Sequence, residues 1–118
     1  MSDTQPTTSK EDRQAYLSTL YTLLSHLKSS ESTICPSQIP RSLHDSDPSR
    51  YPDWRSLMDP VREVVWEEAR EGRVEVTQKG EARRYEDKGD LRGPIRVRRG
   101  EKWDEGLVER YTSGNGSE

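Results

Sequence analysis

Two short segments in which apolar and charged residues alternate flank a long basic stretch, and they restrict the fold more than any other feature. The first runs from Arg73 to Thr77 and the second from Ile95 to Arg98. Alternation with a period of two is typical of a strand with one buried face. We therefore predict an antiparallel two-stranded hairpin over residues 72–99. The side chains expected on its buried face are Val74, Val76, Ile95 and Val97.

A long amphipathic helix is predicted before the hairpin. Ser9 and Asp12 have the spacing of a capping box, in which each side chain bonds the backbone amide of the other residue. From there to about Lys28, leucines recur at intervals of three and four residues, which places them on one face of a helix. These leucines are Leu17, Leu20, Leu24 and Leu27.

Another helix is expected directly before the hairpin, from Pro60 to Glu71. Asp59 would be its cap, and Gly72 would end it because glycine accepts the left-handed backbone conformation without steric cost. Residues 53–58 are expected to form a short helical turn. Either this turn precedes a separate helix, or the two form one helix that is kinked at Pro60.

The region between these helices is less regular. Thr33 and Ile34 are expected to form a short strand on the edge of the hairpin. A second helix is predicted to start near Pro36, but Pro40 would then remove a needed backbone amide. This helix is therefore short, irregular, or begins later, at Ser37. Residues 44–52 are rich in turn formers and are predicted to be a loop.

Length and composition allow one small domain. The chain has 118 residues, of which 28% are hydrophobic and 35% are charged, enough for a single core. Residues 1–8 and 113–118 are polar and are expected to be disordered tails around a folded domain at 9–99. Residues 100–112 are predicted to form a short C-terminal helix that either packs on the domain or extends from it.

The charge of the chain is unevenly distributed. The net charge is −3, yet residues 73–99 hold nine basic and five acidic side chains, a net charge of +4. No apolar run reaches the roughly 20 residues of a membrane span, and the start of the chain lacks the pattern of a secretion signal. A single cysteine, Cys35, excludes an internal disulfide. We expect a soluble, non-secreted protein of the cytoplasm or nucleus, with no membrane contact.

The predicted order of elements is that of a winged helix, a helix-turn-helix variant with a C-terminal β-hairpin. The sequence also carries Ile-Cys-Pro-Ser at 34–37, Asp-Trp-Arg-Ser-Leu-Met at 53–58, Gly-Arg-Val-Glu-Val-Thr-Gln-Lys-Gly at 72–80 and Arg-Gly-Pro-Ile-Arg at 92–96. With these motifs, residues 17–98 resemble an uncharacterised winged-helix family of bacteria and fungi, known only as a domain of unknown function.

The resemblance implies a fold and no activity or site residues. That fold is α+β and mainly helical: a winged helix-turn-helix of three helices with an antiparallel β-hairpin wing. Pro40 and Glu68 depart from the pattern of the family, where a helix former and an apolar residue are usual. Glu68 falls on the apolar side of its helix, so we expect it at the edge of the buried stripe.

Nucleic-acid binding through the basic wing is the first functional hypothesis. The helix at 59–71 carries two basic and five acidic residues, which disfavours insertion into a DNA groove. The wing instead offers cations for phosphates and a tyrosine for base stacking, on DNA or RNA, with low sequence specificity. A solvated hairpin that only aids solubility is the alternative. The wing residues are Lys79, Arg83, Arg84, Tyr85, Lys88, Arg92, Arg96 and Arg98.

A protein-interaction module is the second functional hypothesis. Trp66 lies between Arg62 and Arg70 on a flank of the third helix that we expect to be partly exposed, and tryptophan and arginine are common in interface hot spots. Alternatively, Trp66 packs with Trp103 under the C-terminal segment. Trp54 is expected in the core. Neither hypothesis fixes the oligomeric state.

Enzyme chemistry receives little support from the sequence. His26 and His44 are far apart in the sequence, and no second cysteine is available to complete a set of ligands. The sequence therefore predicts no metal site. We expect His26 on the solvent side of the first helix and His44 in a loop. Cys35 at a helix start is expected to be a small half-buried residue rather than a nucleophile with a lowered pKa. The chain is predicted to be non-enzymatic, with no catalytic residues and no cofactor.

Overall fold

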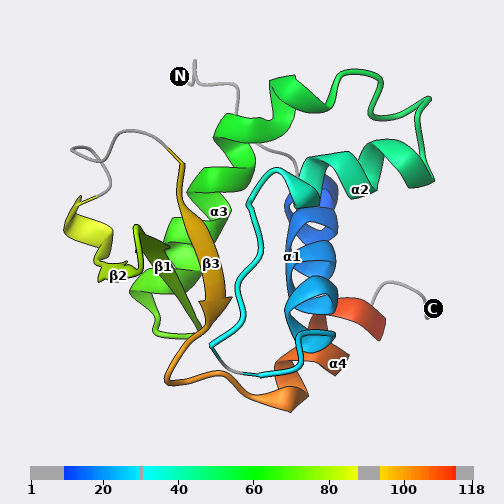
Figure 1. Ribbon diagram of the computed structural model, residues 1–118. Helices are drawn as coiled ribbons and strands as arrows, with labels where there is room; N and C mark the ends of the chain where they lie inside the picture. The colour runs from blue at the N-terminus through cyan, green and yellow to red at the C-terminus, as the bar shows by residue number, and fades with distance from the viewer. Residues whose placement is uncertain (1–9, 30, 88–93, 114–118) are drawn as a thin grey trace, which may run out of the picture.

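A computed structural model describes residues 10–29, 31–87 and 94–113, and Figure 1 shows its fold. This part of the chain is α+β, with four α-helices and a three-stranded antiparallel sheet. In chain order the elements are α1 (Lys10–Ser25), α2 (Gln38–Ser46), the 3-10 turn η1 (Trp54–Leu57), α3 (Met58–Arg70), β1 (Val74–Gln78), β2 (Glu81–Arg83), the 3-10 turn η2 (Tyr85–Asp87), β3 (Arg96–Arg99) and α4 (Glu105–Ser113). The predicted tail at 1–8, most of the tail at 113–118, and Ser9 lie outside the described residues.

The predicted pairing of the two alternating segments is confirmed, because β1 and β3 are antiparallel with Val76 opposite Val97. The stretch between them is not the plain loop that we predicted. The chain turns at Lys79 and Gly80, both with positive φ, and returns as β2, so the sheet order is β2-β1-β3. Two residues with positive φ match the twist of a tight hairpin, which a longer loop would not require.

The expected short strand before α2 is present as a single β-bridge. The Ile34 amide donates to the Val97 carbonyl over 2.8 Å, and the Val97 amide donates back over 2.9 Å. This bridge attaches residues 33–35 to the free edge of β3.

Helix α2 begins at Gln38, after Ser37, which is the later of the two predicted starts. Pro40 is then the third helical residue and lies in the first turn, where a missing amide costs no hydrogen bond. The predicted loop start at His44 is wrong, because the helix continues to Ser46. Helix α1 ends at Ser25, one turn before the predicted end near Lys28.

Helix α3 continues directly from η1. The Asp53 carboxylate accepts a hydrogen bond from the Arg55 amide and caps this entry, whereas the predicted cap Asp59 is already helical. Pro60 lies in the first turn of α3. The predicted end at Gly72 is confirmed: its φ is +84, and the Arg73 amide donates to the Glu68 carbonyl over 3.1 Å. The Gly72 amide also donates to the Ala69 carbonyl over 3.0 Å, and the two bonds pair carbonyls that the end of a helix would otherwise leave without a donor.

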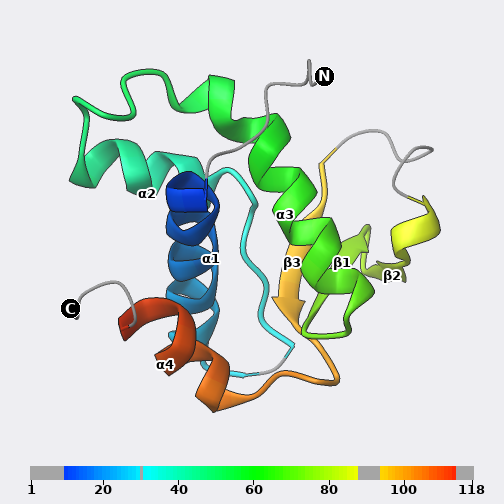
Figure 2. The same cartoon turned by 180° about the vertical axis from the view of Figure 1, so that it is seen from behind.

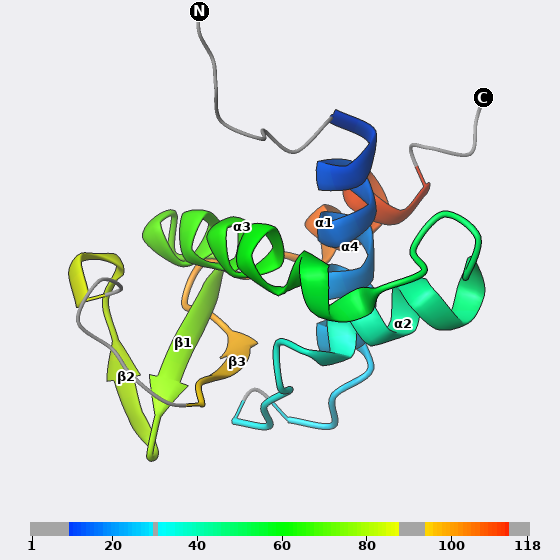
Figure 3. The ribbon, with the colours of Figure 1, turned by 90° about the horizontal axis from the view of Figure 1, so that it is seen from above.

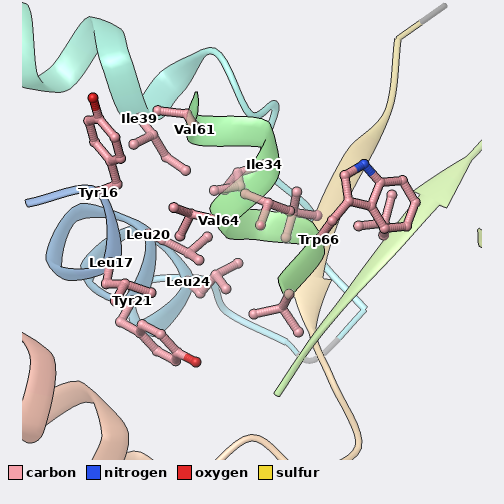
Figure 4. Packing of buried hydrophobic residues seen from close by; sticks show 14 of the residues in the cluster. Tyr16, Leu17, Leu20, Tyr21, Leu24, Ile34, Ile39, Val61, Val64 and Trp66 are labelled. Atoms are coloured by element: carbon pink, nitrogen blue, oxygen red, sulfur yellow. The ribbon is translucent and has the colours of Figure 1, made fainter. Parts of the chain in front are cut away.

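One hydrophobic core joins the helices to the sheet. Figure 3 shows α3 lying across the sheet, and Figure 4 shows leucines of α1 meeting residues of α3. All four valine and isoleucine side chains expected on the buried face of the hairpin are buried, each at most 4% exposed. The same cluster contains Leu17, Leu20 and Leu24 of α1.

The C-terminal helix packs on the domain rather than extending from it. Figure 2 shows α4 beside α1, and the Gln14 side-chain amide donates to the Tyr111 carbonyl over 3.0 Å. The Tyr21 ring stacks on Trp103 at 5.1 Å and on Tyr111 at 4.9 Å between ring centroids. These contacts cover one side of α1 with aromatic rings.

Glu68 is the main departure from the predicted packing. We expected it at the edge of the buried stripe, but it is 2% exposed. Its carboxylate accepts a hydrogen bond from the Tyr21 hydroxyl and another from the Arg73 Nε over 2.8 Å. A buried carboxylate is tolerated when it is both paired and hydrogen-bonded, which explains why this position escapes the apolar rule.

Candidate functional site

The described basic residues of the wing are distributed over β2, β3 and the turns that follow β1 and β2. Arg96 lies opposite Thr77 of β1, and Lys79 follows Thr77 by two residues along the chain. Both therefore lie near the turn that joins β1 to β2. Arg83 lies opposite Val76, and the chain then leaves the sheet through Arg84 toward η2. Two predicted members of the wing set, Lys88 and Arg92, lie outside the described residues.

Two of the wing arginines are paired with carboxylates of the sheet itself. The Arg98 Nη2 is 2.6 Å from Glu75 Oε1, and the Arg83 Nη2 is 3.4 Å from Glu81 Oε1. The Arg83 Nε is buried and has no hydrogen-bond partner in the described part of the chain. Arg83 and Arg98 therefore already form ion pairs with carboxylates of the sheet.

Among the wing cations that the structure describes, three are exposed. No carboxylate in the described ranges lies within ion-pair distance of Lys79, Arg84 or Arg96. The Arg96 Nε donates to the Thr33 hydroxyl over 2.9 Å, which orients the guanidinium without neutralising it. These three residues are the wing cations best placed to meet an external anion.

Tyr85 is held against α3. The Arg70 guanidinium lies 5.1 Å from the centre of the Tyr85 ring, a cation–π distance. Both residues line a groove of about 670 Å³ between the end of α3 and strands β1 and β2. Arg83, Arg84, Glu86 and Glu101 also line the groove. Its mixed charges give no clear preference for one sign of ligand.

The set predicted for protein interaction is not assembled on the surface. Arg62 and Arg70 are exposed, but Trp66 is only 5% exposed, so the expectation of a partly exposed ring is wrong. Figure 4 shows Trp66 on the side of α3 that faces the strands, and Trp103 stacks on Tyr21 instead of joining it. The sheet packs against the flank that the helical wheel left open.

The outer face of α3 is acidic, as predicted. Asp59 and Glu63 are exposed, and Glu67 forms an ion pair with Arg13 of α1. Carboxylates on this face repel the phosphates of a duplex, which argues against docking α3 into a groove.

Sequence reasoning missed a basic and aromatic cluster at the start of α2 and α3. Trp54, expected in the core, is only half buried. The Arg55 guanidinium lies 4.7 Å from the centre of its ring and the Arg41 guanidinium 5.4 Å from it. The Trp-Arg pair at 54–55 was a usable signal for an exposed ring, whereas the approach of Arg41 depends on the fold.

Cys35 lies beside this cluster. Its Sγ is 3.2 Å from the Ser37 hydroxyl. Burial raises the pKa of the Cys35 thiol, but hydrogen bonds with Ser37 and the charges of Arg96 and Arg41 lower it, and the net effect is a lowered pKa. The thiol is half buried, and no base lies next to it to complete a nucleophilic pair among the contacts of the described residues.

The two histidines lie in different environments. His26 is exposed, as expected, but it lies just after α1 rather than on it. His44 belongs to α2 rather than to the predicted loop, and its Nδ1 lies 2.6 Å from the Tyr51 carbonyl. Within residues 10–29, 31–87 and 94–113, no group of three His, Cys, Asp or Glu side chains is placed to hold a metal ion. None of the described helices is long and apolar enough to cross a membrane.

One comparison with known protein families gives a match. A family model described as "Protein of unknown function (DUF3253)" matches residues 13–100. The matched range begins within α1 and ends just after β3, so it leaves out α4. No curated protein matches the chain.

Proposed function

The chain belongs to this family of proteins of unknown function, and we propose that its domain is a winged helix that binds nucleic acid without enzymatic chemistry. Helices α2 and α3 take the place of the helix-turn-helix, and the β1–β3 pair takes the place of the wing. Contact is made mainly through the sheet and its basic residues, with low sequence specificity.

The observation that carries this proposal is the contrast between the exposed cations of the sheet region and the acidic outer face of α3. Lys79, Arg84 and Arg96 are exposed cations without a carboxylate partner in the described part of the chain, whereas the outer face of α3 presents Asp59 and Glu63. Phosphate contacts supply most of the sequence-independent affinity for nucleic acid, and base contacts supply specificity. A cationic arm beside an acidic helix therefore favours backbone binding over base readout.

Fluorescence anisotropy at low salt tests the proposal with duplex DNA, single-stranded DNA and structured RNA as separate ligands. The variant combines Lys79→Ala, Arg84→Ala and Arg96→Ala, which leaves the paired Arg83 and Arg98 intact. We expect weaker binding to every ligand that binds, and a salt dependence reduced by about one unit of slope for each lost phosphate contact.

A control with the same change of net charge separates local contact from general attraction. It combines Lys10→Ala, Lys28→Ala and Arg110→Ala, three exposed residues that belong to no strand. The control is expected to bind nearly as well as the wild type. Absence of binding to all three ligands, or an equal loss in the control, would refute the proposal.

A further inference from the structure

Two arginines from separate parts of the chain, Arg41 and Arg55, meet at the Trp54 ring, and a third, Arg96, bonds Thr33 in the segment that leads into α2. Arg41 belongs to the first turns of α2, Arg55 to η1 and Arg96 to β3. None of the three was expected to act with Trp54. Each guanidinium is exposed, and no ion pair joins any of them to a carboxylate among the residues that the structure describes.

Trp54 orders two of the three guanidiniums. Arg41 and Arg55 lie 5.4 Å and 4.7 Å from the centre of its ring, within the range of cation–π attraction. An arginine side chain normally loses considerable rotamer freedom when it binds a ligand. The Trp54 ring restricts that freedom before binding, so less ordering cost remains when a ligand arrives.

Backbone contacts connect the strand that carries Arg96 with the start of α2. The bridge between Ile34 and Val97 sets Cys35 opposite Arg96. The Cys35 amide donates to the Gln38 Oε1 over 3.0 Å, and Gln38 and Arg41 are neighbours on one side of α2 because they are three residues apart. The lowered pKa of the Cys35 thiol agrees with this arrangement, because Arg96 and Arg41 both contribute to it.

The carboxylates closest along the chain do not neutralise this cluster. Asp53 accepts the Arg55 backbone amide and so acts as the cap of η1. Asp45 and Asp59 each follow an arginine of the cluster by four residues, and the described contacts include no ion pair from either to it. The three side chains are therefore exposed, with no carboxylate at ion-pair distance among the described residues.

We propose that Arg41, Arg55 and Arg96 form a binding site for a phosphate group, with Trp54 as the platform that holds two of them. Guanidinium groups bind phosphate oxygens through paired, charge-assisted hydrogen bonds, which a lysine cannot reproduce. The inference rests on the proposed function in that the phosphate is one of a nucleic-acid backbone. Free phosphate has the same chemistry and is distinguished from it by the test.

Nuclear magnetic resonance of the full chain tests this site directly. Inorganic phosphate is titrated into one sample and a thymidine oligonucleotide without a terminal phosphate into another, while the Arg Nε–H and Trp indole N–H signals are recorded. We expect the signals of Arg41, Arg55, Arg96 and Trp54 to shift together and to saturate with the oligonucleotide. Signals of Arg110 on α4 are expected to stay unchanged.

Matched variants connect the shifts with affinity. Trp54→Leu keeps every charge but removes the platform, and we expect oligonucleotide affinity to fall by about threefold to fivefold. Arg55→Gln is expected to weaken binding and to lower the salt slope by about one. Arg110→Gln carries the same charge change on α4 and is expected to have almost no effect. Dispersed amide spectra verify that each variant is folded.

The outcomes separate this site from the proposed function. Oligonucleotide binding that shifts the signal of Arg84 but not those of Arg41, Arg55 and Trp54 would overturn the site and leave the proposed function standing. Saturable shifts with inorganic phosphate, without oligonucleotide binding, would support the site and refute the proposed function. Full affinity in Trp54→Leu, or an equal loss in Arg110→Gln, would overturn the role of the cluster.

Discussion

Glu68 illustrates how single residues connect distant parts of this domain. Its buried carboxylate accepts hydrogen bonds from Tyr21 of α1 and from Arg73, which follows α3 and leads into β1. Because one oxygen, Oε1, accepts from both partners, loss of the carboxylate leaves a buried hydroxyl and a partly buried guanidinium without their acceptor. The pair has a structural role, since neither Tyr21 nor Glu68 is exposed.

The first prediction follows from this network. Glu68→Ala is expected to lower the free energy of unfolding by about 3 kcal/mol, because removal of the carboxylate leaves Tyr21 and Arg73 without their hydrogen-bond acceptor. Glu63→Ala, at an exposed position of the same helix, is expected to change it by about 0.5 kcal/mol or less. Urea denaturation measures both variants, and equal effects would contradict the structural role of Glu68.

The buried tyrosines predict a loss of stability at high pH. Burial, followed by the charge of Asp12, raises the pKa of Tyr16 to about 12, and burial also raises the pKa of Tyr21 and Tyr51. These groups bind their protons more tightly in the folded state than in the unfolded chain. Stability is therefore full below pH 10, the ordinary tyrosine pKa, and falls between pH 10 and about 12.

Urea denaturation at a series of alkaline pH values, together with tyrosinate absorbance, measures this loss. In Tyr16→Phe the free energy of unfolding is expected to fall less steeply with pH than in the wild type, because one of the responsible hydroxyls is gone. An identical pH dependence in the two proteins would show that Tyr16 does not contribute.

For single residues, the sequence predicted which side chains are buried better than it predicted which side chains they contact. The period of two placed Val74 and Val97 correctly, because alternation alone determines the face of a strand. The helical wheel placed Trp66 and Glu68 near the limits of an apolar stripe, but the width of that stripe depends on the size of the neighbouring sheet. The Tyr21 partner of Glu68 lies 47 residues away and has no local signal.

At the scale of elements, the junctions are more constrained than the elements themselves. Gly100 follows β3 and packs on the turn between α3 and β1. A Cβ atom at Gly100 would lie 2.4 Å from the Gly72 carbonyl oxygen and 2.9 Å from backbone carbons of Arg73 and Val74. These neighbours are backbone atoms, so a side chain at this position displaces the start of β1 from the end of β3.

Gly100→Ala is accordingly predicted to destabilise the domain by about 1–3 kcal/mol, the usual range for overpacking. Gly106→Ala is the matched control, since its Cβ would lie at an ordinary 3.5 Å from the Asp104 side chain and alanine favours the helix. Thermal denaturation compares the two, and we expect the control to be unchanged or slightly more stable. A reversed order would mean that the junction adapts to the extra carbon.

Helices with a clear apolar period and strands with strict alternation were predictable, whereas β2 was not. Glu81, Ala82 and Arg83 form a short edge strand with little burial, so no apolar pattern marks it. The wing cations were recognised by composition, but the position of Arg83 beside β1 depends on this strand. The cluster at Trp54 was missed for a similar reason, since α2 and η1 meet only in the folded chain.

At the scale of the whole molecule, a chain of contacts runs through every layer. Trp103 and Tyr111 stack on Tyr21, Tyr21 donates to Glu68, and Glu68 pairs with Arg73 where the chain enters β1. The core itself is one cluster that includes residues of α1, α3 and the sheet. A domain with one continuous core is expected to unfold in a single transition, even though α4 lies beyond the matched family range.

Trp103→Ala tests whether α4 belongs to that transition. Loss of a half-buried ring is expected to lower the free energy of unfolding by about 2 kcal/mol, and a single transition should remain. Far-ultraviolet circular dichroism reports the helices, and the combined fluorescence of the buried Trp66 and the half-buried Trp54 reports the packing around α3, so the two curves should coincide. If α4 docked independently, Trp103→Ala would release it and leave the midpoint of both curves unchanged, because the remaining core would not depend on Tyr21 being covered.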